Sequence, residues 1–389
     1  MKKVFALLLT LAMVLTLAAC GGGSGSGSNS SGGGSSAPSG SASAPATGGE
    51  SSGGSEEKTF TPSGKTLNVG VQSNIISIPT VYAYEHGYYQ ELGLDVNLIM
   101  FPNGSPENEG LAAEQLDVAS NGLASVYSMA SGLCDWIGES DSGSATLSIY
   151  MRPDCDALNY KGQIAGKPNM YGSAESLKGL RVLGPTSTME QWAAASYFSQ
   201  FGLEAGADYE YLNMDRAAAA QAVITGEGDV FVATDVDYAN MMENAGFIKV
   251  ADCADATGTN FNNGFLARKD ILKDRYDDVV LFLQAMYRAA DDLQDPEVRN
   301  AFAYQYYSEN GKPATPEDVA YETEIRPFLT VQDIAAPDFY LGSGALQVGA
   351  FFASIGTIEE DQVAIIEEAI NPQPMIDAFG LNIKGAALN

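Results

Sequence analysis

From residue 64 to about residue 268, the pattern of apolar and polar positions predicts strands that alternate with helices. Leu67–Val71 alternates apolar with small residues and predicts a first strand, and Asp95–Phe101 predicts a second. A helix from about Thr80 to Glu91 lies between them, and Gly93 ends it. Further strands are predicted near residues 116–119, 136–138, 146–151, 180–183, 209–211, 229–233, 247–250 and 265–267. Strands separated by helices of about 10–15 residues predict parallel sheets with helices on both faces.

Residues that favour helix starts and turns sharpen this pattern. Ser105-Pro106-Glu107 places a capping serine before a proline and an acid, and predicts a helix start. Ser187–Glu190 has the capping-box pattern and predicts another. Asp215 is the expected cap of a third helix, and Asn121-Gly122 predicts a turn. After residue 268 the pattern becomes mainly helical, with helices expected near 275–292, 296–308, 316–325, 345–354 and 359–370.

The N-terminal segment is an export signal followed by a polar spacer. Two lysines precede an apolar run, Val4–Leu17, which is shorter than the roughly 20 residues that a membrane span needs. Small residues follow at positions 18 and 19, as at a cleavage site. From Gly21 to about Lys58 the chain is mostly Gly and Ser, and such a segment does not bury enough apolar surface to order itself. As a flexible coil it reaches roughly 34 Å.

Length and charge narrow the class of protein. Removing residues 1–58 leaves 331 residues, enough for two domains or one split domain with a large core. The net charge is −29, and residues 1–58 contribute none of it. A strongly acidic chain is disfavoured as a nucleic-acid binder. The charge is explained by solubility, or by attraction of a cationic or zwitterionic solute.

Histidine and cysteine are scarce. His86 is the only histidine, so the usual general base and the commonest metal ligand are almost missing. It ends a predicted helix, where a C-terminal capping role explains it. No catalytic residue, metal site or cofactor is predicted. Besides Cys20 there are Cys134, Cys155 and Cys253, so at least one of these three thiols is unpaired.

Two resemblances refine this interpretation. Leu17-Ala18-Ala19-Cys20 resembles the lipobox of bacterial lipoproteins, which implies acylation of Cys20 and a head tethered to the outer face of the bacterial cell membrane. The segment of about residues 64–330 resembles the solute-binding proteins of ABC importers in the nitrate/sulfonate/taurine group, which includes receptors for thiamine pyrimidine precursors. The segments that carry this second resemblance are Gly87–Val96, Leu111–Val118, Ser176–Val182 with Thr186–Thr188, Asn213–Asp215, Ala218, Ala219 and Gly226–Asp229.

The family resemblance implies a periplasmic-binding-protein-like (type II) α/β fold with a ligand cleft between two lobes. Lobe 1 would comprise 64–148 plus 264–389, and lobe 2 would comprise 152–258. The crossovers would lie near Thr146–Pro153 and Asn262–Arg268, close to Cys155 and Cys253, so pairing of these two thiols stays open. The implied partners are a small-molecule solute and the permease and ATPase subunits of an importer, and the chain is expected to be a monomer.

Ligands of such sheets bind beyond the carboxyl ends of the strands. The candidate ligand-binding residues are therefore Ser73, Asn74, Asn121, Gly122, Thr186, Ser187, Thr188, Trp192 and Asp235. Several have local explanations as well: Ser187 and Asp235 as helix caps, and Asn121 at a turn. Trp192 is explained equally by a core position, and core is the expected place of Trp136.

The chain departs from the family where an oxyanion would bind. Thr186 stands where the family has glycine, and Glu139, Asp141 and Asp235 lie near predicted cleft loops without an evident Arg or Lys. Carboxylates beside an anion need a compensating cation or a raised pKa. The solute is therefore a sulfonate- or nitrate-like anion, a neutral heterocycle or an amine. The alternative functions are a surface sensor without a transport partner and an enzyme of cofactor biosynthesis on the same fold.

Overall fold

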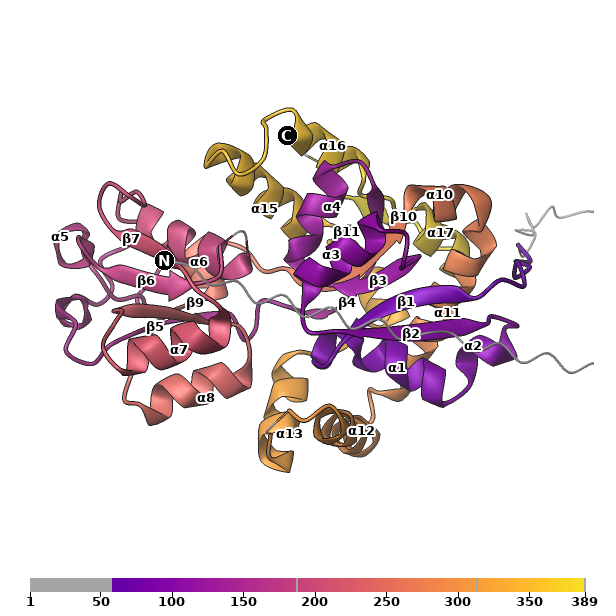
Figure 1. Ribbon diagram of the computed structural model, residues 1–389, viewed down its shortest axis with the longest axis horizontal. Coiled ribbons are helices and arrows are strands. Elements are labelled where there is room, and N and C mark those ends of the chain that lie inside the picture. The colour runs from indigo at the N-terminus through magenta and orange to yellow at the C-terminus, as the bar shows by residue number, and fades with distance from the viewer. Residues whose placement is uncertain (1–57, 187, 313, 388–389) are drawn as a thin grey trace, which may run out of the picture. The chain divides into compact units, whose positions relative to one another are not determined.

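Two five-stranded sheets form the framework of the protein in the computed structural model (Figure 1). The structure describes residues 58–186, 188–312 and 314–387. The predicted signal peptide, Cys20 and nearly all of the spacer lie outside the described residues, as does Ser187. We call the first sheet with its helices lobe 1, and the second sheet with its helices lobe 2.

Lobe 1 has the strand order β2-β1-β3-β10-β4. Its strands are β1 Leu67–Gln72, β2 Val96–Phe101, β3 Val118–Asn121, β4 Cys134–Ser142 and β10 Asn262–Arg268. Its helices are η1 Ile75–Ser77, α1 Ile78–Glu85, α2 Tyr88–Glu91, α3 Gly104–Ala112, η2 Leu123–Ser125, α4 Val126–Ala130, α10 Lys269–Asp274, α11 Tyr276–Asp292, α12 Pro296–Glu309, α13 Pro316–Ile325, α14 Val331–Ile334, α15 Ser343–Ser354, α16 Gln362–Glu368 and α17 Gln373–Phe379. A small parallel pair, β11 Tyr340–Leu341 and β12 Lys384–Gly385, lies near the C-terminus.

Lobe 2 has the strand order β7-β6-β8-β5-β9. Its strands are β5 Ser148–Met151, β6 Arg181–Gly184, β7 Glu210–Asn213, β8 Val230–Ala233 and β9 Ile248–Asp252. Its helices are η3 Asp156–Asn159, α5 Ala174–Leu177, α6 Met189–Ser199, α7 Arg216–Ile224, α8 Val236–Asn244 and α9 Cys253–Thr257.

Both sheets are mixed, which corrects the expectation of purely parallel sheets. β1 pairs in parallel with β2 and β3, but β10 is antiparallel to β3 and to β4. In lobe 2, β6 is parallel to β7 and β8, whereas β5 is antiparallel to β8 and β9. The reversed strands β5 and β10 are those that enter directly from the other lobe. They occupy most of the two predicted crossovers, and the chain passes between the sheets at residues 143–147 and 253–261.

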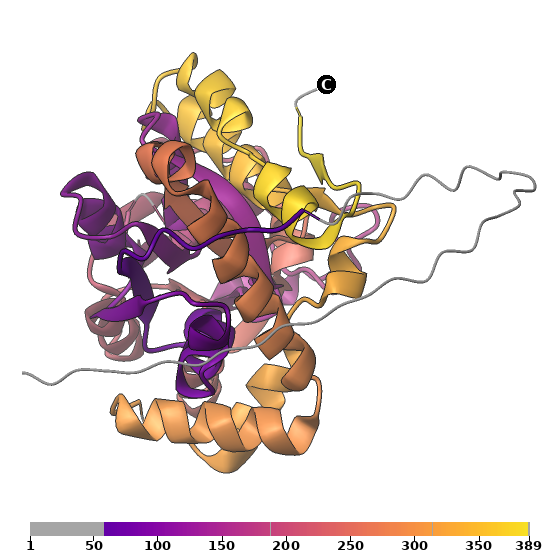
Figure 2. The same cartoon turned by 90° about the vertical axis from the view of Figure 1, so that its right-hand side faces the viewer.

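The long helix α11 fills the core of lobe 1. Its residues Phe282, Leu283 and Met286 are fully buried, and Phe282 packs on Phe265 of β10 with ring centroids 5.5 Å apart. The hydroxyl of Tyr287 donates to the carbonyl oxygen of Glu139 at 2.6 Å. Figure 2 shows this orange helix crossing in front of the sheet, with the yellow C-terminal helices beside it. Burial of this apolar stripe holds the C-terminal helices on the first sheet.

Local starts and ends differ from the sequence prediction at several places. The helix predicted from Thr80 to Glu91 is two helices, α1 and α2, separated at His86 and Gly87. α3 begins at Gly104 with Asn103, not Ser105, as its N-cap. Asn121 is the fully buried last residue of β3 and not part of a turn. α6 begins after Thr188, so the predicted capping box does not set its start.

Other predictions about single residues are confirmed. His86 is the C-cap of α1, and its ring stacks on that of Tyr82 at 3.8 Å. Trp136 is fully buried in the core. Cys134, Cys155 and Cys253 are all free and buried, so the open question of a pair between Cys155 and Cys253 is answered against a disulfide.

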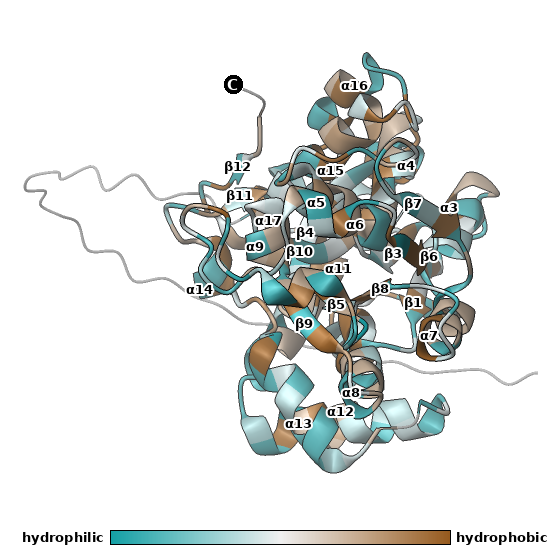
Figure 3. Ribbon diagram, turned by 90° about the vertical axis from the view of Figure 1, so that its left-hand side faces the viewer, coloured by the Kyte–Doolittle hydropathy of each residue, from teal (hydrophilic) through white to brown (hydrophobic). Residues whose placement is uncertain are grey.

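The outer helices are polar on their exposed faces. Figure 3 colours α13 mostly from white to the teal of hydrophilic residues. Among the residues that the structure describes, no helix is both long and apolar enough to cross a membrane.

Candidate functional site

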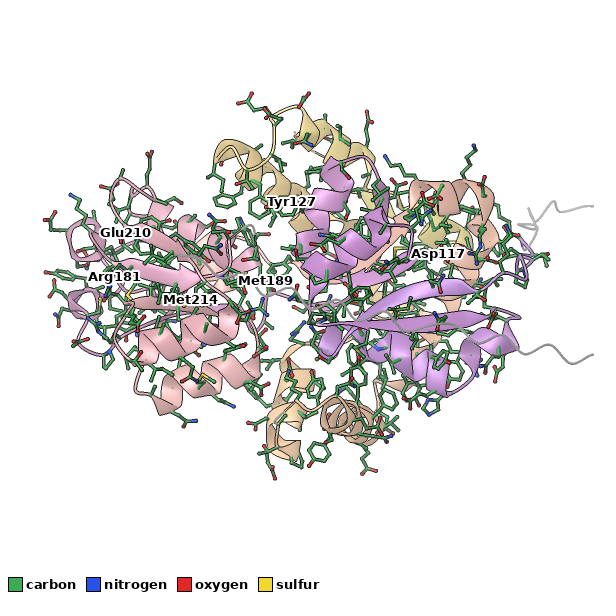
Figure 4. The ribbon with its side chains drawn as sticks, in the orientation of Figure 1. Asp117, Tyr127, Arg181, Met189, Glu210 and Met214 are labelled. Carbon is green, nitrogen blue, oxygen red and sulfur yellow. The ribbon has the colours of Figure 1, made fainter. Side chains whose placement is uncertain are left out.

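A cavity of ≈ 700 Å³ lies where the strand ends of the two lobes face each other. The carboxyl-end segments of β1, β2, β3, β6, β7 and β8 all contribute to its wall, as expected for sheets of this kind. Figure 4 places Tyr127 of lobe 1 and Met189 of lobe 2 on the facing sides of this space. The polar and charged side chains of its lining are Gln72, Asn74, Asn103, Ser105, Asn108, Asn121, Tyr127, Thr186, Thr188, Glu190, Asp215, Arg216, Thr234, Asp235, Tyr238, Asn263, Glu322 and Arg326.

The cavity brings together most of the residues that the sequence predicts for ligand binding. Those in its wall are Asn74, Asn121, Gly122, Thr186, Thr188 and Asp235. Ser73 is not in the wall, and Ser187 lies outside the described residues. Trp192 is also absent from the wall: it is 4% exposed and packs edge-on against Phe261 at 5.8 Å. The core interpretation of Trp192 is therefore the one that the structure supports.

Side chains already cap several helix starts that face the cavity. Asn74 accepts from the N–H of Ile76 at the start of η1. Asp215 accepts from two N–H groups at the start of α7, as the sequence predicts for this cap. Asp235 accepts from the N–H of Tyr238 in α8 at 3.1 Å. These caps use N–H groups that would otherwise be available to an anion.

Arg216 and Glu190 form the charged pair of lobe 2 in the cavity. Nε of Arg216 donates to Oε1 of Glu190 at 2.6 Å. The Glu190 residue is 1% exposed, and its Oε2 has no hydrogen-bond partner among the described residues. Burial opposes the charge of Arg216, but Glu190 and Asp235 outweigh it and raise the pKa of the guanidinium. Arg216 therefore keeps its positive charge, and that charge is already paired with the carboxylate of Glu190.

Arg326 is the matching cation of lobe 1, at the end of α13. Its Nε and one terminal nitrogen donate to Oδ2 of Asp141, at 3.1 and 2.6 Å. Its other terminal nitrogen lies 3.4 Å from Oε1 of Glu322. Burial again opposes the charge, and the two carboxylates reverse that effect and raise the pKa of Arg326. Arg326 thus has two acidic partners before any solute enters.

Two buried amides complete the lobe 1 wall. The Asn121 Nδ2 donates to the carbonyl of Gly104 at 3.1 Å, and the Asn263 Nδ2 donates to Asp141 at 3.1 Å. The Oδ1 atoms of both amides have no hydrogen-bond partner among the described residues. The contact at Gly104 is tight, because a Cβ there would lie 2.1 Å from Oδ1 of Asn121.

Behind this wall, Gln72 links the cavity to a buried acid. Its Nε2 donates to Glu107 at 2.9 Å and to the carbonyl of Ser120 at 3.1 Å. The Glu107 side chain is fully buried, and burial raises its pKa well above the usual value. The hydrogen bond from Gln72 only partly offsets this shift.

Sequence patterns identified Asp235 but neither of the two arginines of this site. They predicted no arginine or lysine near the cleft, and Arg216 and Arg326 show that prediction to be wrong. Arg216 follows Asp215, just after a predicted strand, so the strand-end rule that selected the other loops would have found it. Arg326 gave no local signal, because it meets Asp141 across 185 positions of sequence.

The lining residues give the cavity an acidic balance. Four carboxylates, on Glu190, Asp215, Asp235 and Glu322, stand against the two guanidiniums. In the described part of the chain, no group of three or more histidine, cysteine, aspartate or glutamate residues is arranged to hold a metal ion.

Direct contacts also join the lobes beside the cavity. Nζ of Lys312 lies 3.3 Å from Asp237 of α8, and Nδ2 of Asn240 donates to Asp318 of α13 at 2.9 Å. The Lys312 ammonium also lies 4.2 Å from the centroid of the Tyr307 ring. We call these contacts between α8 and residues 312–318 the interlobe latch.

The fold is the type II periplasmic-binding-protein fold: two α/β lobes with a cavity between them. The sequence pattern of the NMT1-like family matches residues 61–305. The chain belongs to this family. The expectation of fold and family is thereby confirmed.

Similarity to individual proteins agrees with this assignment. A protein of Brachyspira hyodysenteriae described as an ABC transporter periplasmic binding protein is 25% identical over 315 residues, which cover 79% of this chain and 88% of that protein. The aliphatic sulphonate-binding protein of Escherichia coli has a TM-score of 0.62 at 17% identity, covering 83% of this chain and 95% of the other. The nitrate-binding protein of Synechocystis has a TM-score of 0.58 at 14% identity, covering 82% and 89%.

Proposed function

We propose that this protein is a lipid-anchored receptor outside the cell membrane that binds a small solute and delivers it to the permease of an ABC importer. The observation that carries the proposal is the ≈ 700 Å³ cavity, whose wall is built from strand ends of both lobes. A solute in that position contacts both lobes at once. Its binding energy therefore favours the arrangement in which the lobes are closed on it.

Closure of the lobes on a solute would require flexible connections between the lobes and contacts that hold the closed form. Residues 143–147 and 258–261 connect the two lobes, and a small change of backbone angles there would move one lobe against the other. The interlobe latch adds contacts that form only when the lobes approach. The closed form would then present a fixed surface to the permease.

The anchor is part of the proposal. The Leu17-Ala18-Ala19-Cys20 run supports acylation of Cys20 and retention at the outer face of the membrane. The spacer would let the lobes move freely while held near the permease.

The solute-binding role is tested by what the protein carries and delivers. The full-length protein is purified in detergent from its native host, and native mass spectrometry then identifies small molecules released on denaturation. The identified solute should stimulate ATP hydrolysis by the host's permease complex in proteoliposomes only when this protein is present. Taurine, other sulfonates and nitrate should be tested in the same ATPase assay, because proteins of similar fold are described as binding sulphonates and nitrate. A folded protein that binds no solute from host extract would contradict the proposal.

The anchor is tested separately through Cys20→Ala. The expected result is loss of radiolabelled palmitate incorporation and release of the protein from the membrane fraction. Cys134→Ala is a matched control, because that thiol is buried in the folded lobe and lies outside the lipobox. Membrane retention of the Cys20 variant would count against lipid anchoring and leave solute binding untouched.

A further inference from the structure

The charges of the cavity differ from what an oxyanion site requires. An anion needs cations or N–H donors that the protein has not already paired. Here each lining guanidinium is in direct contact with a carboxylate: Arg216 with Glu190, and Arg326 with both Asp141 and Glu322. An incoming sulfonate or nitrate would compete with those carboxylates and would also face the carboxylates of Asp215 and Asp235.

Most of the backbone donors at helix starts in the wall are committed in a similar way, although the start of η2 after Gly122 has no side-chain cap. The starts of α3, α7 and α8 and of η1 are all capped by a side chain of the cap residue itself. The start of α6 has no side-chain cap bond, but its first turn contains the Glu190 carboxylate. The four capped starts and the acidic first turn of α6 therefore disfavour the anion binding that helix N-termini often provide.

The unpaired polar atoms of three buried side chains in the cavity wall are hydrogen-bond acceptors. Glu190, Asn121 and Asn263 are at most 1% exposed. Each belongs to the cavity wall, and each has a buried side-chain oxygen without a hydrogen-bond partner among the described residues. A buried acceptor without a donor destabilises the folded protein. A guest that supplies N–H donors would relieve this destabilisation, whereas a guest made of acceptors would not.

From these observations we propose that the cavity binds a small cation with several N–H donors (an amidinium, a guanidinium or a protonated amine) and that Glu190 is its main acceptor. The proposal rests on the receptor function above and specifies its solute class. Glu190 fits the role because Arg216 contacts only its Oε1, which leaves Oε2 for the solute. The acidic balance of the wall adds long-range attraction for a positive charge.

Three probes of similar shape distinguish whether the cavity prefers a cation, a neutral molecule or an anion. Benzamidinium, benzamide and benzenesulfonate share a phenyl ring and differ in carrying a positive charge, no charge and a negative charge. Isothermal titration calorimetry at pH 7 and low salt is carried out on the full-length protein in detergent. Agmatine, taurine and nitrate form a second, non-aromatic set. We expect benzamidinium to bind at least tenfold more tightly than benzamide, agmatine more tightly than taurine, and no heat of binding from benzenesulfonate or nitrate.

Glu190→Gln is the decisive variant, since it removes the charge and keeps the shape. It should weaken benzamidinium binding at least tenfold, about 1.4 kcal/mol. Glu243→Gln is the matched control, because Glu243 lies in lobe 2 but outside the cavity wall, where its carboxylate accepts from Tyr150. That control should bind as the unmodified protein does.

A second pair of variants tests the proposal independently, in case Glu190→Gln does not fold. Asp235→Asn keeps a side chain that caps helices well, and Asp252→Asn makes the same change at the cap of α9, away from the cavity. Only the Asp235 variant should weaken cation binding, by threefold or more.

The outcomes separate this inference from the receptor function. If sulfonate or nitrate probes bind more tightly than every cation, the cavity is an anion site: the inference is wrong and the receptor function stands. If no cation binds, or if Glu190→Gln binds benzamidinium unchanged, the inference is also wrong. The receptor function is then decided by the solute that the protein carries from host extract.

Discussion

Glu107 shows how a single buried group can set the pH response of the folded state. Its side chain is fully buried in α3, where Gln72 donates to one oxygen and the other oxygen has no partner among the described residues. Burial raises the pKa of the nearby Tyr306, and an ionised Glu107 would raise it further. Burial raises the pKa of Glu107 itself, so the folded protein holds a proton that the unfolded chain releases near pH 4.5.

Glu107→Gln should therefore stabilise the protein increasingly as the pH rises. With the folded-state pKa above the unfolded one, the native state binds more protons, so Glu107 lowers the stability of the protein as pH rises from about 4.5 to the folded pKa. Glutamine has no charge to bury, so the gain at pH 8 should be of order 1–3 kcal/mol and should vanish near pH 4. Urea unfolding at both pH values measures it.

The control for this change is Glu109→Gln on the exposed side of the same helix. It should alter stability by less than about 0.5 kcal/mol at either pH. A gain at pH 8 that equals the gain at pH 4 would show that the charge of Glu107 is not the cause.

At the scale of elements, the cavity depends on where helices start. The caps Asp215 and Asp235 each do two things: they satisfy backbone N–H groups of α7 and α8, and they place a carboxylate in the cavity wall. Since Arg216 is the first residue of α7, the cap also fixes where that guanidinium stands relative to Glu190. Changes at these starts should affect stability and binding together.

Asp215→Ala should cost about 1 kcal/mol of stability, as loss of a cap does, and should also weaken binding of the carried solute. Asp252→Ala removes the equivalent cap of α9, which is outside the cavity wall. It should lower the melting temperature to a similar extent and leave binding unchanged. Melting curves and calorimetry of the two variants side by side check both parts. Equal effects of both variants on binding would mean that Asp215 acts only through stability.

Local sequence signals predicted the elements well but not their assembly. Helix 316–325 was predicted to the residue, and Asp215 was predicted as a cap, because both depend on neighbours within one turn. The antiparallel direction of β5 and β10 was missed, since strand direction depends on which lobe the chain comes from. The Arg326–Asp141 pair was also missed, because no local pattern encodes a contact between segments that are distant in sequence.

For the whole molecule, the relevant equilibrium is between lobes that touch and lobes that separate. The interlobe latch contributes an ion pair, Lys312–Asp237, and a hydrogen bond, Asn240–Asp318. In salt, the ammonium of Lys312 and the carboxylate of Asp237 on the opposite lobe attract each other only at short range. The latch therefore favours the closed arrangement by a small free energy, and a solute must supply the rest.

Asn240→Ala should shift this equilibrium toward separation. Loss of one hydrogen bond costs about 1 kcal/mol, which corresponds to roughly a fivefold weaker apparent affinity for the carried solute. Small-angle X-ray scattering without solute should also give a larger radius of gyration. Asn244→Ala, one turn further along α8 and exposed, is the control and should behave as the unmodified protein. A compact variant with unchanged affinity would show that the latch does not govern closure.

The position of β10 has a consequence for the order in which the exported chain matures. β10 lies between β3 and β4, yet it is made after every strand of lobe 2. A polypeptide that crosses the membrane from its N-terminus thus cannot finish its first sheet until residue 268 has emerged, whereas β5 to β9 form one uninterrupted stretch. Nascent chains halted near residue 260 should accordingly resist protease in residues 148–252 and be cut readily between β1 and β4, and the reverse pattern would refute this sequence of events.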